Sequence, residues 1–418
     1  MGEKKFHFAW IVLIGLSIMM GVARGGVNNA GGLFLSPVSE DLGIGIGSLS
    51  IYLSISSIIT MLFLPLAGKM LAKYNIRGLL IFGIVLQAGS FALFGFMKSV
   101  WGWYILSAPM AFGAIFITTL AGPVIINRWF KKNNGLAMGL MMAAVGLFGA
   151  FIQPFAGNLI AEQGWRNAYM ILGVGAIVVI VPVILLMIRK NPEEKGLLPY
   201  GMKDGKDADF NPEENVLRGV TFADAKKSLA FFSMLLFLFF MTAIGSFAQH
   251  IGPYAIGTGY SIEFAGQVMG SFMVGMLVGA LVFGFLTDKI GARNTGYMSM
   301  IVGIIALVLL IFVPGNPVVF SAAIGMFGFV TASIGTLGPL LTSAIFGNKE
   351  YGQIYATIGI GLAVAGIVAL PGYGFVYDIT GSYTLVLYMI IAMLIINIIL
   401  ITLAFKGKKN LEEKGLYN

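Results

Sequence analysis

Two ionisable side chains lie deep inside long apolar runs of this chain, Arg24 in the first run and His250 in a later one. An ionisable group inside a lipid bilayer costs free energy, so such a residue marks a functional site by default. A guanidinium presents a rigid fork of donors that matches a carboxylate or a phosphate. A site for an organic cation is instead expected to offer a buried carboxylate, and no Asp or Glu lies in the middle of any apolar run. The pattern therefore predicts a site that binds an anion.

Arg24 lies about sixteen residues into a run that begins at Phe8, so a helix rising roughly 1.5 Å per residue places it near mid-membrane. Small and polar residues share its helix face by i, i+3 and i+4 spacing, namely Gly21, Gly25, Asn28 and Gly32. Because such a face is typical of a cavity wall, we expect Arg24 to bind the substrate with Asn28 beside it. The alternative is a structural arginine that satisfies carbonyl groups at the end of a neighbouring helix.

A second polar stripe surrounds His250 and consists of Thr242, Ser246, Gln249, His250 and Pro253. His250 is predicted to contact the substrate or carry a proton, and the alternative is a packing histidine with satisfied nitrogens. Gly252-Pro253 is predicted to interrupt the helix just beyond it. Further polar candidates, each weighed against a packing or interfacial role, are Tyr52, Thr119, Gln153, Tyr254, Tyr351 and Tyr355.

The composition requires a membrane protein. The 418 residues are 58% hydrophobic and 11% charged, and apolar runs of 18 or more residues recur along the chain. With no Cys and two His, the sequence predicts no disulfide and no metal site. The 23 Met and 33 Phe are typical of apolar packing and indicate no cofactor. It contains no phosphate loop of the Gly-Lys-Ser/Thr type, which argues against ATP-driven transport. We assign the net charge of +8 to loops that set membrane topology, not to nucleic-acid binding.

The hydropathy predicts twelve membrane helices. The first, Phe8 to Phe34, is too long for a signal peptide. The others are expected at 48–71, 78–97, 100–127, 134–162, 165–189, 228–257, 262–287, 293–313, 317–346, 350–377 and 382–405. An even number places both termini on one side. Loops on that side carry most Lys and Arg, whereas the opposite loops hold only Lys98 and Arg166, so the termini are predicted to be cytoplasmic in an inner (plasma) membrane.

A polar segment divides the helices into two sets of six. Residues 190–227 are rich in Lys, Glu, Asp, Asn, Gly and Pro, and we interpret them as a cytoplasmic linker between an N-terminal bundle, 1–189, and a C-terminal bundle, 228–418. Within the linker, Thr221 to Asp224 has the pattern of a capping box that begins a short surface helix.

The two sets repeat one another at nearly constant spacing. Gly122-Pro123 corresponds to Gly338-Pro339, 216 residues later. The set Pro154, Gly157 and Gly164 corresponds to Pro371, Gly374 and Gly381, 217 residues later. Parallel repeats of this kind place the substrate site near the membrane midplane, between the halves.

The sequence GFLTDKIGAR, Gly284 to Arg293, resembles the signature loop of the major facilitator superfamily of secondary transporters, G-x-x-x-D-[RK]-x-G-x-[RK]. A degraded copy holds Gly68, Lys73 and Arg77, with Ala72 and Asn75 at the other two positions. The resemblance implies an all-α fold of twelve transmembrane helices in two pseudo-symmetric six-helix bundles, with helices 1 and 7 facing each other across the cavity. It also implies a cytoplasmic gate formed by Gly284, Asp288, Lys289, Gly291 and Arg293.

Three further segments resemble the monocarboxylate porters and the oxalate/formate antiporters of that superfamily. They are NRWFKKNNGLAMG from Asn127, GWRNAYMILG from Gly164 and TFADAKKSLAFF from Thr221. This resemblance implies a small organic anion as substrate, carried with a proton or in exchange. The oxalate/formate antiporters carry basic residues in helices 8 and 11, and the monocarboxylate porters carry an Arg in helix 8. Here helix 8 has no Arg or Lys and helix 11 none after Lys349, so those site residues do not carry over.

The sequence therefore predicts a monomeric transporter, not an enzyme, that moves a small organic anion, with a monocarboxylate expected, by alternating access. The predicted substrate-binding residues are Arg24, Asn28, Gln249, His250, Tyr52, Gln153, Tyr254 and Tyr355. One alternative is an exporter of drugs or amphiphiles, suggested by the Pro-x-x-Gly pattern at Pro154 to Gly157. Another is a membrane sensor without transport activity, which would need a soluble domain that neither 190–227 nor the C-terminal tail supplies.

Overall fold

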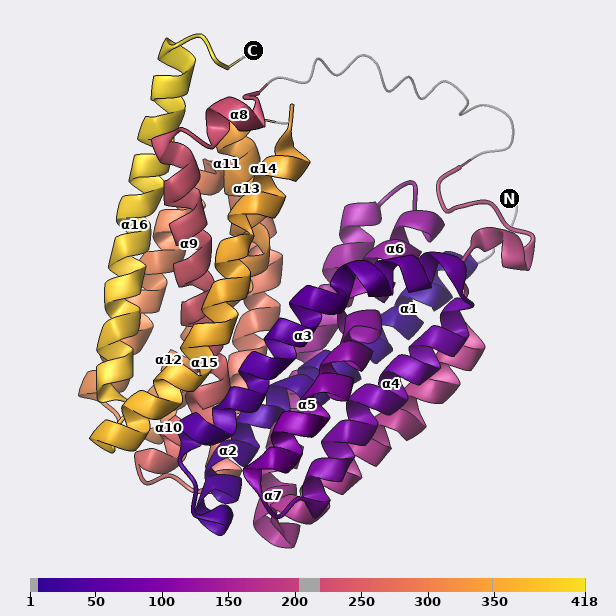
Figure 1. Ribbon diagram of the computed structural model, residues 1–418, viewed down its shortest axis with the longest axis vertical. Coiled ribbons are helices and arrows are strands. Elements are labelled where there is room, and N and C mark those ends of the chain that lie inside the picture. The colour runs from indigo at the N-terminus through magenta and orange to yellow at the C-terminus, as the bar shows by residue number, and fades with distance from the viewer. Residues whose placement is uncertain (1–6, 203–218, 348, 418) are drawn as a thin grey trace.

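The computed structural model describes residues 7–202, 219–347 and 349–417, and nearly all of them are helical. Figure 1 shows two groups of helices, one formed by the N-terminal half of the chain and one by the C-terminal half. The groups meet at one end and diverge at the other. We call the first the closed end, where α3 begins, and the second the open end, where α1 begins and α16 ends.

Long helices build the N-terminal group. The first crosses the whole group as α1, a π-helix and α2 in direct succession. The bounds are α1 Phe8–Met20, π-helix Gly21–Asn28, α2 Asn29–Leu42, α3 Ile46–Lys73, α4 Ile76–Leu93, α5 Val100–Ala114, π-helix Ile115–Leu120, α6 Ala121–Trp129 and α7 Asn134–Met187. Short 3-10 helices occur at Phe94–Phe96 and Pro192–Lys195.

The C-terminal group begins after a short surface helix, α8, whose N-cap Thr221 accepts a hydrogen bond from the amide of Asp224 as the capping pattern predicts. The bounds are α8 Phe222–Ala225, α9 Leu229–Ser246, 3-10 helix Phe247–His250, α10 Ile251–Gly257, α11 Ile262–Phe312, α12 Pro317–Ala332, α13 Ile334–Phe346, α14 Tyr351–Ile358, α15 Ile360–Thr380 and α16 Thr384–Glu413. Part of the predicted linker, 203–218, lies outside the described residues.

The helices account for twelve membrane crossings. Within the described residues, 11 helical stretches are long and apolar enough to span a membrane, and one of them is the 54-residue α7. Gly164 interrupts α7 with a φ of 77° and a ψ of 160°, which only glycine adopts readily. At about 1.5 Å per residue each side of Gly164 is long enough to cross a core of roughly 30 Å. The predicted fold of twelve helices is thus confirmed, because α7 crosses twice.

Two predicted helix ends were wrong. Helix 1 was expected to end at Phe34 but continues to Leu42, because polar residues lower the hydropathy there without breaking the helix. It ends at Gly43, which has a φ of 63°. The last helix continues past 405 to Glu413, where i,i+4 ion pairs such as Lys408–Glu412, at 3.6 Å, accompany its final turns.

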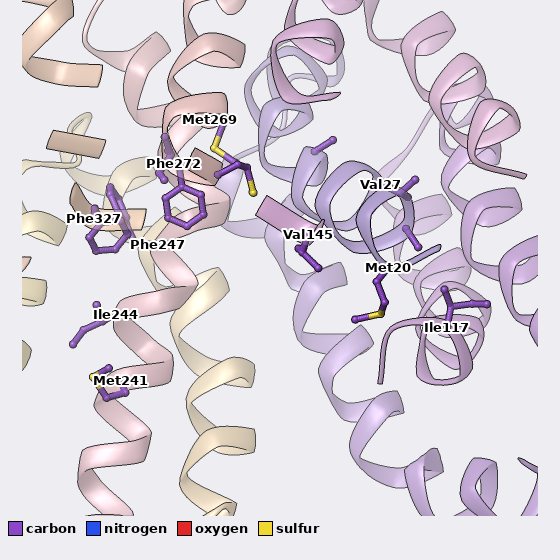
Figure 2. Close-up of a cluster of buried hydrophobic side chains, with 14 of the residues drawn as sticks. Met20, Val27, Ile117, Val145, Met241, Ile244, Phe247, Met269, Phe272 and Phe327 are labelled. Carbon is purple, nitrogen blue, oxygen red and sulfur yellow. The ribbon is translucent and has the colours of Figure 1, made fainter. Parts of the chain in front are cut away.

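Buried apolar side chains hold the two helices that carry the candidate site. Figure 2 shows buried side chains of both groups, among them Met20 and Val27 of helix 1, Val145 of α7, and Phe247 and Phe272 in the C-terminal group. All five side chains are at most 3% exposed. Helix 1 and the helix of His250 are therefore fixed within their own groups by packing.

Repeated glycines bring the groups into backbone contact. A Cβ atom on Gly157 of α7 would lie 2.9 Å from the Cα atom of Gly266 in α11. A Cβ atom on Gly374 of α15 would lie 2.6 Å from the Cα atom of Gly47 in α3. Because Gly157 and Gly374 are counterparts in the sequence repeat, the repeat builds two equivalent contacts between the groups.

A carboxylate adds a polar contact to the second of these places. The amides of Ile46 and Gly47 begin α3 and donate hydrogen bonds of 2.9 and 2.8 Å to the two carboxylate oxygens of Asp378 in α15. The N-cap of α3 is Gly45, which has no side chain to do this. Asp378 therefore caps α3 from the other group, and its charge is also favourable at a helix N-terminus.

We predict that Asp378→Asn shifts the protein toward conformations that open at the closed end. The amide loses the charge that favours the helix N-terminus, typically worth about 0.3–1 kcal/mol, so a shift of up to several-fold in population is expected. Because the chain has no Cys, spin labels on the exposed positions Glu162 and Ser382 would report the distance between the groups without background labelling.

The matched control is Asp41→Asn, which removes a carboxylate that pairs with Arg166 at 2.6 Å within the N-terminal group. The distance distribution should lengthen for Asp378→Asn and stay as in the parent for Asp41→Asn. Equal distributions in all three proteins would contradict a role for Asp378 in holding this end closed.

Candidate functional site

A cavity of about 750 Å³ lies between the two helix groups. The N-terminal group contributes polar atoms from helix 1, α3 and the second π-helix, and the C-terminal group contributes them from α9 and the 3-10 helix. The polar lining residues are Asn28, Tyr52, Ser56, Ser57, Thr60, Thr118, Thr119, Thr242 and Gln249. No charged residue belongs to the lining that the structure describes, so any charge that acts on a ligand must come from the rim.

Arg24 is not among the lining residues but lies one helical turn beyond Asn28, a position that we call the rim of the cavity. It precedes Asn28 by one helical turn on the same face, and because helix 1 begins at the open end, Arg24 lies on the open side of Asn28. Its side chain is exposed, whereas its neighbours Ala23 and Gly25 are buried. Within the described part of the chain Arg24 forms no hydrogen bond and no ion pair. The structure therefore gives no support to the alternative in which Arg24 satisfies the carbonyl groups of a neighbouring helix.

The segment that carries Arg24 is a π-helix, which the sequence analysis did not predict. Three glutamine amides from three other helices bond to it. The Nε2 atom of Gln153 lies 2.8 Å from the carbonyl oxygen of Gly25, that of Gln87 lies 2.8 Å from Asn28 Oδ1, and that of Gln249 lies 3.3 Å from the carbonyl oxygen of Asn28. The three glycines between Gly21 and Gly26 were the only signal of this turn, because hydropathy does not depend on turn width.

His250 is placed differently from Arg24. It is fully buried, its Nε2 atom lies 2.7 Å from the carbonyl oxygen of Leu370, and its Nδ1 atom lies 2.9 Å from the hydroxyl of Tyr383. A carbonyl oxygen only accepts, so Nε2 donates, which lets Nδ1 of a neutral ring accept from Tyr383. In this conformation neither nitrogen is free for a substrate.

The helix break near His250 also differs from the prediction. The 3-10 segment, Phe247–His250, precedes Gly252-Pro253 instead of following it. The reason is that Pro253 has no N–H group for the carbonyl four residues earlier, that of Gln249. Helix 1 approaches the 3-10 helix closely at this point. A Cβ atom on Gly32 would lie only 2.4 Å from the carbonyl oxygen of Gln249.

The structure brings some predicted residues together and separates others. Asn28, Tyr52, Gln249 and Thr119 line the cavity. Gln153 is fully buried outside the lining. The hydroxyl of Tyr254 donates to the carbonyl oxygen of Leu310 at 3.0 Å, and the rings of Tyr351 and Tyr355 stack with their centres 5.6 Å apart. None of these three tyrosines belongs to the described cavity lining.

Sequence reasoning missed a polar stripe on α3. Ser56 and Thr60 follow Tyr52 at intervals of four residues and line the cavity with it. Their hydroxyls donate to the carbonyl oxygens of Tyr52 and Ser56, at 3.0 and 2.9 Å. The i, i+4, i+8 spacing was visible in the sequence and would have indicated this face of the helix.

The loop motif lies at the open end. Gly291 turns the chain there with a φ of 79°, and Arg293 lies 5.2 Å from the ring centre of Phe405 in α16. Its counterpart Arg77 donates to the carbonyl oxygen of Ile188, at 3.0 Å. The two copies thus anchor to the last helix of their own group. The side chain of Asp288 and the environment of Gly284 lie outside what the structure describes.

A multi-pass membrane protein with a central cavity between two repeated helix groups has the architecture of a transporter. The chain belongs to the major facilitator superfamily, whose sequence pattern matches residues 13–270 and 228–415. It is accordingly a transporter and not an enzyme.

Related proteins and a solved structure agree with this placement. The oxalate:formate antiporter of Oxalobacter formigenes is 25% identical over 373 residues, which cover 85% of each chain. Monocarboxylate transporter 12 of Mus musculus is 24% identical over 357 residues, 79% of this chain and 72% of that protein. The crystal structure of a bacterial homologue of the human lysosomal transporter Spinster, inward-facing and unoccupied, is similar with a TM-score of 0.71, at 13% identity, over 99% of each chain.

We predict that His250→Gln lowers the stability of the protein while the pH dependence of its uptake keeps its shape. The substitution leaves the buried hydroxyl of Tyr383 or the carbonyl of Leu370 without its partner, which typically costs about 1–3 kcal/mol. Thermal unfolding of the purified protein and uptake into vesicles across pH would measure the two effects.

His7→Gln is the matched control, because His7 is the only other histidine and lies at the start of helix 1. This variant should keep the pH profile of the parent, although it loses the hydrogen bond that His7 Nδ1 accepts from the amide of Ala9 at the start of helix 1. A flattened pH profile for His250→Gln alone would instead make His250 the site of a coupled proton.

Proposed function

We propose that this chain transports a small organic anion, and specifically a monocarboxylate, across an inner (plasma) membrane by alternating access. The observation that supports it most is the guanidinium of Arg24, exposed at the rim of the cavity without a partner among the described residues. The fork of an arginine matches the two oxygens of a carboxylate. The names of the oxalate:formate antiporter and of monocarboxylate transporter 12 agree with such a substrate.

Three cavity residues would complete the site. Asn28 lies one turn from Arg24, and Tyr52 and Gln249 face the same cavity from α3 and from the C-terminal group. Because side chains of both helix groups would contact the anion, a bound anion would favour conformations in which the two groups are close together. Such a coupling suits alternating access. The largely apolar remainder of the lining suits the short carbon chain of a monocarboxylate.

The membrane orientation follows from the positive loops. With both termini cytoplasmic, the open end faces the cytoplasm, and the two groups correspond to bundles 1–189 and 228–418 joined by the linker 190–227. The loop Gly284, Asp288, Lys289, Gly291 and Arg293 would then close the cytoplasmic side in the opposite conformation. We propose that the transporter works as a monomer, because one chain supplies both helix groups and the cavity between them.

Coupling is proposed to occur without a buried carboxylate. No acidic residue lines the described cavity, and both nitrogens of His250 bond to protein atoms. A proton therefore travels as the undissociated acid form of the substrate, or the anion is exchanged for another anion.

A second candidate function is export of drugs or amphiphiles. It is favoured by the absence of charge from the described cavity lining, together with the contact of the Pro154–Gly157 segment against α11. Such a carrier would bind lipophilic compounds in the cavity without using Arg24, which separates the two proposals.

We predict that Arg24→Ala weakens the binding of monocarboxylates at least about a hundredfold. Hydrogen bonds to charged groups typically contribute about 1.5–3 kcal/mol each, and the variant loses two of them. Arg24→Lys should recover little of this loss, because a point charge does not replace two parallel bonds. Isothermal calorimetry with formate, acetate and pyruvate would measure the affinities.

The control is Arg166→Ala, which removes an exposed arginine that is paired with Asp41 at the closed end. This variant should bind like the parent. Binding to Arg24→Ala within a few-fold of the parent, or tighter binding of a lipophilic cation than of any anion, would replace the proposal by the exporter.

A further inference from the structure

The backbone around Arg24 needs support from outside helix 1. A π-helix is rare and usually limited to a single turn, yet eight residues, Gly21–Asn28, adopt it here. The segment holds three glycines, which lose more conformational freedom on folding than any other residue. Local preference therefore does not explain the turn, and contacts from neighbouring helices must stabilise it.

Two buried glutamines bond to the backbone on either side of Arg24. Gln153 of α7 donates to the carbonyl oxygens of Gly25 and Gly26, at 2.8 and 3.3 Å. Gln87 of α4 donates to the carbonyl oxygen of Ala23 at 3.4 Å. Both side chains are fully buried. The residues that flank Arg24 in the chain are thus bonded to two different helices of the same group.

Gln87 also determines how Asn28 faces the cavity. Its Nε2 atom lies 2.8 Å from Asn28 Oδ1, so the oxygen of that amide is occupied. The amide nitrogen of Asn28, which only donates, remains for the cavity that Asn28 lines. Gln87 therefore turns Asn28 into a hydrogen-bond donor for a ligand, next to the donors of Arg24.

Neither glutamine is explained by stability alone. The Oε1 atoms of Gln87 and Gln153 are buried without a hydrogen-bond partner among the described residues. A buried polar atom in this state typically costs about 1–3 kcal/mol, which an apolar side chain of the same size would avoid. A glutamine amide nevertheless supplies an uncharged hydrogen-bond donor, which neither an apolar side chain nor a carboxylate has. It can bond the carbonyl groups of the turn and leave the charge of Arg24 uncompensated.

We propose that Gln153 and Gln87 are positioning residues that hold the π-helical turn of helix 1 and direct Arg24 and Asn28 into the cavity. The inference rests on the proposed function for its consequence, the binding of an anion by these two side chains. Its geometry does not depend on that function. Without the glutamine amides the turn relaxes toward an α-helix, which rotates more per residue, and Arg24 turns away from the face of Asn28.

The first experiment measures the position of residue 24 directly and needs no substrate. Because the chain has no Cys, Arg24→Cys introduces a single thiol, whose rate of reaction with a water-soluble methanethiosulfonate reports its exposure to the cavity. Adding Gln153→Met, which keeps the volume and removes the donor, should slow the reaction about tenfold or more. Gln87→Met should act in the same direction, and Gln163→Met, an exposed glutamine of α7, should leave the rate unchanged.

The second experiment measures affinity for acetate and pyruvate both in proteins that keep Arg24 and in the Arg24→Lys background. Gln153→Met should weaken binding tenfold or more in the parent and have little further effect in Arg24→Lys, because a residue that acts through another gives non-additive losses. Equal losses in both backgrounds would indicate a general packing role and overturn the proposal.

The outcomes separate this inference from the proposed function. Unchanged thiol reactivity in both Gln153→Met and Gln87→Met, with folded protein, overturns the positioning role whatever the substrate is. A slowed thiol reaction in a protein that binds no anion supports the positioning role and rejects the anion function. If Gln153→Met does not fold, Gln87→Met alone decides by the same two measurements.

Discussion

The arrangement of the whole site depends on one charge that the protein leaves uncompensated. A guanidinium near the membrane centre costs several kcal/mol, with insertion scales alone giving about +2.5 to +3.5. No charged group among the described residues pairs with Arg24 to offset this cost, and its side chain is exposed on the open side of the cavity. The described cavity lining holds no carboxylate, and the buried groups nearest in the chain are bonded by neutral amides. An anion that enters the cavity would relieve the cost, so the unfavourable charge becomes a source of affinity.

The candidate site lies where the two helix groups meet. A ligand bound there would contact both groups and could therefore affect their relative position. Gln249 of the C-terminal group bonds to the carbonyl of Asn28 at 3.3 Å, and Gly32 lies against its backbone. Toward the closed end the groups are held together by glycine contacts and by Asp378 at the start of α3. Movement of one group against the other would therefore alter the surroundings of Asn28. Small residues at the contacts let such movement occur without side chains in the way.

The fold could be predicted from the sequence because it rests on signals that extend over many residues. These signals can be recognised without knowing which residues lie close together in space. They are the twelve apolar runs, the polar segment 190–227 and the repeated glycines Gly157 and Gly374. Part of the site could be predicted on the same basis. Asn28 lies one helical turn after Arg24, and Gln249 lies on the same helix face as Thr242. The roles of His250 and Gln153 could not, because they depend on partners such as Leu370 and Gly25 that are far away in the chain. Polarity predicted that these side chains matter but not which way they point.

The most direct test of the account is the thermal unfolding of the purified parent protein against a panel of ligands at equal concentration. A ligand that binds the folded state raises its stability by RT ln(1 + [L]/Kd), about 2.7 kcal/mol at a hundredfold excess over Kd. Monocarboxylates should raise the unfolding temperature, inorganic phosphate should raise it less, and lipophilic cations should leave it unchanged. A stabilisation by lipophilic cations that no carboxylate matches would contradict the central claim that Arg24 is the binding group for an anion.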